Sequence, residues 1–334
     1  MDNSSPRAAS PLAPYGSLTP DVVLDAVDGV GFRTDGRLQA LNSYENRVYL
    51  VYGEDVPPVV AKFYRPQRWT DDQIREEHAF TQELAAAEIP VVAPLAPSGD
   101  TLHVHAGFRF AVYPKQGGRA PEFDRRDTLE WMGRFIARIH VAGGARSFVH
   151  RPALDVETFG AVPRAWLLAH AAIPGDLLAA WSAVTELALD GVRHCFARAG
   201  VPKQLRLHGD CHAGNVLWTD DGPHFVDFDD TRSGPAIQDL WMLLSGDRAE
   251  MTQQLAAVLR GYEDFRELDP RELHLVEALR TLRLIHYSAW LAQRWADPAF
   301  PAAFPWFGTP RYWQDRILEL REQVALMDEP PLAV

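Results

Sequence analysis

The stretch from Leu205 to Trp241 constrains this chain more than any other part of its 334 residues. The tripeptide His-Gly-Asp ends at Asp210, Asn215 follows five positions later, and Asp227 stands twelve positions after Asn215. Between Asn215 and Asp227, two short apolar runs flank an Asp-Asp-Gly-Pro turn, a pattern typical of a hairpin. Because a hairpin returns the chain to its starting point, the sequence predicts that Asp227 lies beside Asn215.

The spacing of these three polar residues suits the transfer of a phosphoryl group from ATP. That reaction needs a carboxylate that orients the attacking hydroxyl, and oxygen ligands that hold Mg2+ against the phosphates. We predict Asp210 and Asp227 as catalytic residues, with Asn215 and Asp227 as the metal ligands, because Mg2+ prefers oxygen donors and keeps several waters. The order matches the Asp-x-x-x-x-Asn span of kinase catalytic loops. The competing interpretation, a polar turn with solvated acids, requires four residue types to coincide by chance.

Further polar residues surround this pattern. Asp229 and Asp230 either support the metal ligands or are solvated acids, and the sequence leaves both interpretations open. Asp239 precedes an apolar run and is expected as an acid at a helix N-terminus. Cys211 has no partner pattern for metal binding or nucleophilic chemistry, so we interpret it as a residue that fills the loop.

A lysine and a glutamate earlier in the chain are candidates for binding the nucleotide. The predicted strand Val59–Tyr64 carries Lys62 among apolar residues, as in the strand whose lysine pairs the ATP phosphates, although a lone strand lysine more often reaches solvent. A capping-box pattern at Thr70 predicts a helix after it. Glu77 shares a face of that helix with apolar residues and is our choice as partner of Lys62. Glu76 is the rival, and a solvated glutamate is the third interpretation.

The composition limits the class of protein. A chain of this length fits two lobes better than one core. The formal net charge of −12 argues against a nucleic-acid partner, which needs a basic surface. Cys195 and Cys211 cannot build a disulfide framework and suit a reducing cytoplasm. No apolar run reaches the roughly 18 residues of a membrane helix, and residues 1–20 lack a signal core, so we expect a cytoplasmic protein without a membrane partner.

Strand patterns dominate the first third of the chain and helical patterns dominate the rest. Strands are expected at 37–41, 47–52, 59–64, 101–105 and 109–113. Helices are expected at 20–27, after Thr70, around 132–139, and at 177–199, 237–244, 251–262, 271–295 and 312–327. Pro114 to Gly118 interrupts both patterns and is the expected hinge. The Arg-Trp-Ala-Asp segment that ends at Asp297 predicts either a buried ion pair or a substrate contact.

Several motifs together carry a family resemblance. HGDCHAGN and the later VDFDD resemble the aminoglycoside phosphotransferase and choline kinase superfamily, whose fold is protein-kinase-like. LNSYENRVY, AKFYRP, GPAIQDLWMLL and RWADPAFP add a narrower similarity, from about Leu18 to about Pro331, to a family of bacterial stress response kinases. The resemblance implies an α+β, two-lobed fold: a disordered tail at 1–18, a nucleotide-binding N-lobe at 19–114 and a helical C-lobe at 115–334.

The same resemblance implies the activity of an ATP-dependent serine/threonine protein kinase. It implies Mg2+ as cofactor, ATP as co-substrate, a monomer, and a protein substrate with a Ser or Thr hydroxyl, for which the serine-rich tail of the chain itself is one candidate. It also implies that Ser43 contacts ATP, although the loop 42–46 lacks the glycines usual in a phosphate-covering loop. Two alternatives stay open: a small-molecule kinase of the aminoglycoside, choline or homoserine type, and an inactive nucleotide-binding module for protein interaction.

Overall fold

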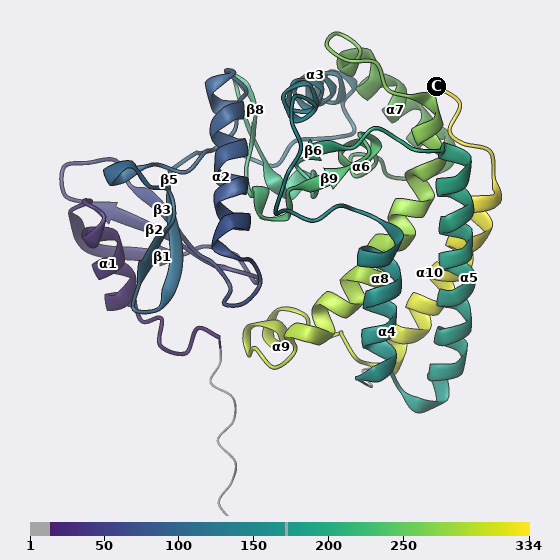
Figure 1. Ribbon diagram of the computed structural model, residues 1–334, viewed down its shortest axis with the longest axis horizontal. Helices are drawn as coiled ribbons and strands as arrows, with labels where there is room; N and C mark the ends of the chain where they lie inside the picture. Colours follow the sequence, from purple (N-terminus) through teal and green to yellow (C-terminus); the bar gives the residue numbers. More distant parts are fainter. Residues whose placement is uncertain (1–13, 171–172) are drawn as a thin grey trace, which may run out of the picture. The chain divides into compact units, whose positions relative to one another are not determined.

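The computed structural model describes residues 14–170 and 173–334, which form two compact units (Figure 1). The described part of the first unit consists of residues 14–70, Leu95–Lys115 and Arg294–Pro305, and the second unit consists of Asp71–Pro94, Gln116–Gln293 and Trp306–Val334. One change of unit follows Lys115, and the division into an N-lobe at 19–114 and a C-lobe at 115–334 stays a prediction. Two segments group differently from the expectation, because 71–94 joins the second unit and 294–305 joins the first.

A five-stranded antiparallel sheet forms the centre of the first unit. Its strands follow the order β1 (Thr34–Ala40), β2 (Arg47–Gly53), β3 (Val59–Phe63), β5 (Phe108–Pro114) and β4 (His103–His105). Each lies within three residues of its predicted bounds. The first unit also contains the short helices η1 (Pro97–Gly99) and α9 (Ala299–Ala303), neither of which the sequence predicted.

Helix α1 (Pro20–Gly29) contributes to the hydrophobic core of the first unit. Its start follows from its sequence, because Thr19 accepts a hydrogen bond from the Val22 N–H at 3.3 Å and proline occupies the first helical position. The apolar face of α1 packs into one cluster with the inward residues of the sheet. Tyr15 and Leu18 belong to the same cluster, although we expected residues up to 18 to be part of the tail. Residues 1–13 of that predicted tail lie outside the described residues.

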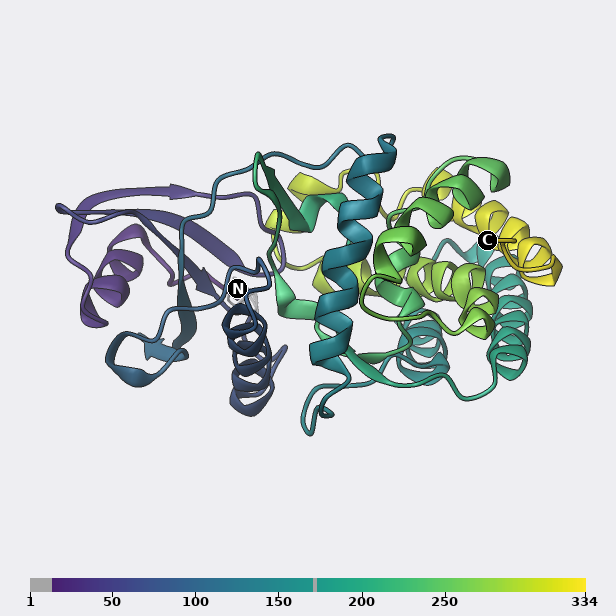
Figure 2. The same ribbon diagram turned by 90° about the horizontal axis from the view of Figure 1, so that it is seen from above.

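Helices build most of the second unit. They are α2 (Asp71–Ala86), α3 (Arg126–Gly143), α4 (Val162–Ala169), α5 (Gly175–Ala199), α6 (Ile237–Trp241), α7 (Arg248–Tyr262), most of α8 (Val276–Arg294) and α10 (Pro310–Asp328), with the short turns η2 (Glu157–Ala161), η3 (Ala213–Asn215), η4 (Phe228–Asp230) and η5 (Pro270–Leu275). Helices α5 and α10 lie side by side in both views (Figure 1, Figure 2). Between α3 and α7, Gly133 and Gly261 permit close contact, since a Cβ at either would overlap the facing backbone.

Two small antiparallel ladders position the predicted catalytic stretch within this helical unit. Strand β6 (Leu205–Leu207) pairs with β9 (Arg232–Gly234), and β7 (Val216–Thr219) pairs with β8 (Gly222–Phe225). The α+β class is confirmed. The sequence did not predict α4, and the single helix expected at 271–295 is divided into η5 and α8. Among the described residues, no helix is long and apolar enough to span a membrane.

Candidate active site

The predicted hairpin between Asn215 and Asp227 is present. Strands β7 and β8 pair in register from Val216 opposite Phe225 to Thr219 opposite Gly222. The backbone N–H after β8, at Val226, donates to the Asn215 carbonyl at 3.0 Å. The hairpin therefore returns the chain to Asn215 one residue before Asp227, as the sequence spacing predicted.

Asn215 is oriented by the predicted base. Its Nδ2 lies 2.9 Å from the Asp210 carbonyl and 3.4 Å from Asp210 Oδ2. With the amide nitrogen turned toward Asp210, the amide oxygen is the end of the side chain that a cation can use. The geometry agrees with a metal-binding role for Asn215 and places Asp210 directly beside it.

Asp227 has an uncommon backbone conformation. Its φ of 58° and ψ of 66° lie in the left-handed region, where most non-glycine residues are strained and Asn and Asp are tolerated best. Because η4 begins at the next residue, this conformation marks the point where the chain leaves the hairpin. Strain of this kind persists where the surrounding structure enforces it, often at functional sites.

Asp239 holds the backbone of the loop that carries Asp210. Asp239 is fully buried, and its carboxylate accepts the backbone N–H groups of His208 and Gly209, both at 2.8 Å. The ring of His140 lies 3.1 Å from the same carboxylate and 2.8 Å from the Tyr262 hydroxyl. The sequence placed Asp239 correctly in the first turn of a helix, α6, but missed this contact with a loop thirty residues earlier.

His208 links the predicted base, Asp210, to the segment that precedes Asp227. Its Nε2 lies 2.9 Å from the carbonyl of Val226, and its Nδ1 lies 3.4 Å from the Asp210 backbone nitrogen. The carbonyl must accept, so Nε2 carries the proton. The imidazole packs against the Phe228 ring, with centroids 4.4 Å apart. One side chain thus connects Asp210 and the residue before Asp227.

The Asp210 carboxylate is surrounded by positive or polar groups. Its Oδ1 lies 2.5 Å from Arg283 Nη1 of α8, and its Oδ2 lies 3.4 Å from His212 Nε2. Burial acts to raise the pKa of the Asp210 carboxyl, but the hydrogen bond with His212 and the charge of Arg283 outweigh it and lower the pKa to about 2. Asp210 is therefore ionised at neutral pH and can accept a hydrogen bond from a hydroxyl.

The donor set fits Mg2+ better than a metal held by protein alone. Among the described residues, no group of three or more His, Cys, Asp or Glu side chains is arranged to bind a metal. Asn215 and Asp227 supply one amide oxygen and one carboxylate, which are hard donors. A cation that takes its remaining ligands from water and phosphates matches this set, as Mg2+ does in kinases.

The two acids that follow Asp227, the predicted metal ligand, lie in different environments. Asp229 is buried and Asp230 lies 2.7 Å from Arg232, so neither is a freely solvated acid. Cys211 is buried, and burial raises the pKa of its thiol well above the ordinary value. This agrees with a residue that fills the loop and takes no part in the chemistry.

Glu76 and Glu77, the two candidates on α2, have different environments. The Glu76 carboxylate accepts three backbone N–H groups from residues 149–151, at 2.5 to 2.8 Å. Glu77 is buried, with Oε2 3.4 Å from Arg151 Nη2. Arg151 also donates to the carbonyls of Phe228 and Asp229, at 3.2 and 2.7 Å. Arg151 therefore connects α2 to the segment that follows Asp227, a link that the sequence did not reveal.

The remaining predicted residues lie in the first unit. Lys62 is 7% exposed on β3, with its ammonium 5.2 Å from the centre of the Tyr64 ring, so it does not simply reach into solvent. The Ser43 hydroxyl donates to the Asn46 carbonyl at 3.1 Å and closes the loop between β1 and β2. Since Lys62 and Glu77 belong to different units, their pairing stays a prediction, as does contact of Ser43 with ATP.

The RWAD segment forms ion pairs within the first unit. Asp297 lies 3.1 Å from Arg47 and 2.7 Å from Arg65, and the second acid, Glu45, lies 3.0 Å from Arg65. Arg294 also pairs with Glu45. Of the two predicted alternatives, a buried ion pair or a substrate contact, the structure has the ion pair, and it fastens α9 to the loop that carries Ser43.

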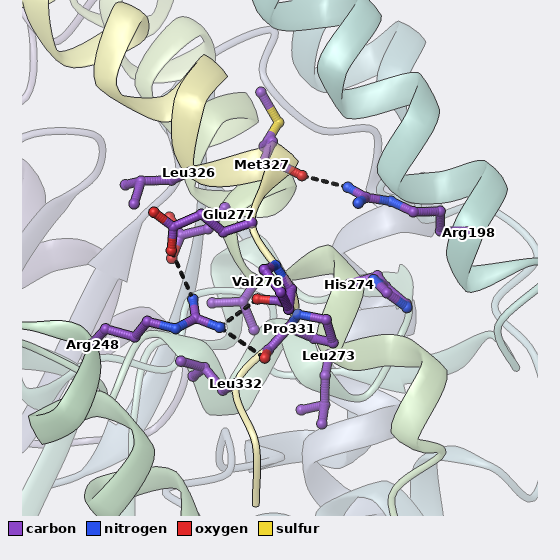
Figure 3. A pocket seen from close by; sticks show the side chains of 12 residues that line it. Arg198, Arg248, Leu273, His274, Val276, Glu277, Leu326, Met327, Pro331 and Leu332 are labelled. Carbon is purple, nitrogen blue, oxygen red and sulfur yellow. Dashed lines mark hydrogen bonds and ion pairs between the residues drawn. The ribbon is translucent and has the colours of Figure 1, made fainter.

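The second unit contains a pocket that the C-terminal segment helps to line (Figure 3). Arg248 lies 3.3 Å from Glu329 and donates to the Pro331 carbonyl at 2.8 Å, while Arg198 donates to the Met327 carbonyl. These contacts fasten the C-terminal segment to α5 and α7. No predicted site residue lines the pocket, so we assign it a structural role.

The fold and this site define a phosphotransferase. The chain belongs to the phosphotransferase enzyme family, whose model matches residues 37–276. Stress response kinase A of Escherichia coli (strain K12) is 48% identical over 318 residues, which cover 95% of this chain and 96% of the relative. The serine/threonine protein kinase RdoA of Salmonella typhimurium is 47% identical with the same coverage. The family resemblance stated above is confirmed.

Solved structures share the fold at low sequence identity. The amicoumacin kinase hAmiN, in complex with AMP-PNP, Ca2+ and Ami, has a TM-score of 0.71 and 21% identity, covering 92% of this chain and 93% of its own. A microcompartment-associated aminopropanol kinase has a TM-score of 0.67 and 17% identity, covering 92% and 97%. Identities this low support the kinase-like fold and leave the substrate undecided.

Proposed function

We propose that this protein is an ATP- and Mg2+-dependent serine/threonine protein kinase that acts in a bacterial stress response. The arrangement of Asp210 beside Asn215, with Asp227 returned to the same level by the hairpin, is the observation that carries the proposal. The similarity to stress response kinase A over nearly the whole chain supports the choice of a protein substrate. We further propose that the protein acts as a monomer in the cytoplasm, in keeping with its two free cysteines.

In the proposed reaction, Asp210 accepts a hydrogen bond from a Ser or Thr hydroxyl and orients its oxygen toward the γ-phosphorus. As the new oxygen–phosphorus bond forms, the bond between the γ-phosphorus and the bridging oxygen breaks, ADP leaves, and the hydroxyl proton passes to Asp210. His208 and Asp239 keep the base in position. Asn215 and Asp227 would hold Mg2+, which would supply charge neutralisation at the phosphates. Lys62, oriented by Glu77, and Ser43 bind the triphosphate.

Transfer of labelled phosphate tests this proposal. The purified protein, incubated with Mg2+ and γ-labelled ATP, is expected to label Ser or Thr residues in itself or in a generic protein substrate. Asp210→Asn removes the proton acceptor and should reduce the rate by about 10²–10⁴-fold while ATP binding persists. Asp190→Asn, at an exposed ion pair on α5, is the matched control and should retain the wild-type rate.

A small-molecule kinase is the alternative that the same experiment can reveal. Choline, homoserine and an aminoglycoside are assayed in parallel by ADP formation. Rapid transfer to one of them, without labelled protein, would contradict the protein-kinase proposal and leave the phosphotransferase assignment intact. Nucleotide binding without transfer to any acceptor would indicate the inactive module instead.

A further inference from the structure

Arg283 contacts the proposed base directly, and the catalytic pattern in the sequence contains no residue in this role. It lies on α8, more than seventy residues after Asp210, with Nη1 2.5 Å from Asp210 Oδ1. The Arg283 side chain is 41% exposed and that of Asp210 is 23% exposed. An acceptor that approaches Asp210 from solvent therefore also meets the guanidinium.

The position of Arg283 is fixed by a rigid element. Its neighbours Leu282 and Ile285 on α8 are buried, and Arg283 Nη1 also lies 4.0 Å from the sulfur of Met242. Arg280, one turn earlier on α8, forms a separate ion pair with Glu277 at 3.2 Å. A guanidinium on a packed helix holds its charge in a defined place, unlike one on a mobile loop.

Asp230, whose charge acts on Asp210, is also balanced by an arginine. Asp230 lies 2.7 Å from Arg232, whose side chain is 6% exposed and stacks over Phe159 at 4.4 Å. In contrast to the buried Arg232, Arg283 has 41% of its side chain exposed. The proposed base is thus flanked by a neutralised acid and by an accessible cation, despite the acidic net charge of the chain.

We propose that Arg283 is a specificity-determining residue that selects the acceptor by charge. It disfavours a hydroxyl that has an ammonium group close by, and it favours a Ser or Thr hydroxyl flanked by carboxylates. The occupant of the acceptor site is therefore an acidic protein segment. This proposal rests on the proposed phosphoryl transfer at Asp210 and adds the substrate class.

The physical reason for this charge preference is the electrostatic field of Arg283 and Asp210, which acts on an approaching acceptor. A cationic amino alcohol needs a carboxylate to compensate its charge, but one oxygen of Asp210 already pairs with Arg283. An anionic segment is attracted to Arg283, and the second oxygen of Asp210, which has only long contacts of 3.4 Å with His212 and Asn215, stays available to the hydroxyl. Because the pair is partly exposed, each charge contributes modestly, about five-fold in affinity, and added salt weakens the effect.

Two fluorescein-labelled peptides with the same central serine, flanked by aspartates or by lysines, test the proposal. Their affinities are measured by anisotropy with the Mg2+–AMP-PNP-loaded protein, and their phosphorylation is measured with ATP. The wild type should bind the acidic peptide about five-fold more tightly. Arg283→Glu should reverse the order, whereas Arg283→Lys should keep it.

Arg193→Glu provides the matched control. Arg193 forms an exposed pair with Asp190 on α5 at 2.6 Å, so its replacement changes the net charge equally but away from Asp210. This variant should keep the wild-type preference. An unchanged preference in Arg283→Glu, or an equal shift in Arg193→Glu, would overturn the proposal.

Binding and transfer separate the two proposals. If the peptides bind with the expected charge preference but neither is phosphorylated, the protein-kinase proposal fails and the role of Arg283 stands. If both peptides are phosphorylated equally well by the wild type and by Arg283→Glu, the role of Arg283 fails and the kinase proposal stands.

Discussion

Backbone strain at Asp227 coincides with its proposed chemical role. A left-handed conformation costs a non-glycine residue roughly 1–2 kcal/mol, although Asp and Asn pay less than other residues. Glycine would adopt the same φ of 58° without that cost. Glycine would therefore remove the strain, and the presence of aspartate is in keeping with the proposed role of its carboxylate.

Two substitutions at Asp227 separate stability from metal binding. Asp227→Gly should raise the free energy of unfolding by about 1 kcal/mol, because it relieves the strain, and should abolish Mg2+-dependent nucleotide binding. Asp227→Asn keeps a side chain that tolerates the conformation and should weaken the metal dependence. Thermal unfolding and Mg2+ titrations with a fluorescent ATP analogue measure the two effects. Magnesium curves identical to the wild type in both variants would refute the metal assignment.

The residues of the proposed site divide into those that the sequence could indicate and those that it could not. The arrangement of Asp210, Asn215 and Asp227 was predictable because one loop and one hairpin hold them, so their spacing carries the geometry. Asp239 and Arg283 were not, since each reaches the loop from a helix distant in sequence. An acid early in a helix and an arginine on a helix look like ordinary solvated residues.

Helix α2 shows how two adjacent glutamates take different roles. Glu76 is occupied by three backbone N–H groups of residues 149–151, while Glu77 faces Arg151 in a buried setting. The positions of the two glutamates on the helix did not decide which of them pairs with Lys62. Because three backbone N–H groups already bind the Glu76 carboxylate, Glu77 is the better candidate. Its carboxylate would then interact with both Arg151 and Lys62.

A double-mutant cycle tests the proposed pair between Lys62 and Glu77. If the two groups act together, the losses in kcat/KM from Lys62→Met and Glu77→Gln should be non-additive, with a coupling of about 0.5–3 kcal/mol. A parallel cycle with Glu76→Gln is the control and should be additive. Additive losses in the first cycle and coupling in the second would make Glu76 the partner instead.

The contact between η5 and α6 predicts a pH-dependent stability. Burial raises the pKa of Glu272 to about 7, despite a hydrogen bond from the Ile237 N–H at 3.0 Å. The folded state therefore binds a proton more tightly than the unfolded state, where the ordinary value is 4.5. Between these values the unfolded state binds fewer protons, so stability must fall as the pH rises through this window.

Glu272→Gln should remove this dependence. The amide cannot ionise but can still accept the Ile237 N–H, so the variant should gain up to about 3 kcal/mol over the wild type at pH 8 and little at pH 4. Urea unfolding at several pH values measures the difference. Glu322→Gln, an exposed site on α10, changes the charge equally and should leave the pH profile unaltered. Parallel profiles for wild type and Glu272→Gln would contradict the prediction.

For the molecule as a whole, the sequence predicted the classes of element better than their assembly. Alternating and helical patterns located the five strands and most helices, because these patterns depend on neighbours along the chain. The inclusion of residues 294–305 in the first unit could not be predicted in this way. It depends on ion pairs between residues more than 230 positions apart, such as Arg65 with Asp297.

This assembly predicts that a residue near the end of the chain stabilises the N-terminal sheet. Asp297 is 3% exposed and pairs with Arg47 and Arg65, which flank the loop after β1 and the end of β3. Asp297→Ala leaves two poorly solvated guanidinium groups without this carboxylate. Removal of one partner from a buried pair costs about 3–5 kcal/mol, so the first unit should open more readily.

Hydrogen exchange measured by mass spectrometry can locate that loss. In Asp297→Ala, amides of β1, β2 and β3 should exchange faster than in the wild type, whereas α5 and α10 of the second unit should be unchanged. Asp25→Ala, an exposed acid on α1 in the same unit, is the control and should exchange like the wild type. Faster exchange in both units would indicate general destabilisation. Wild-type exchange in the sheet would show that α9 and the RWAD segment do not support it.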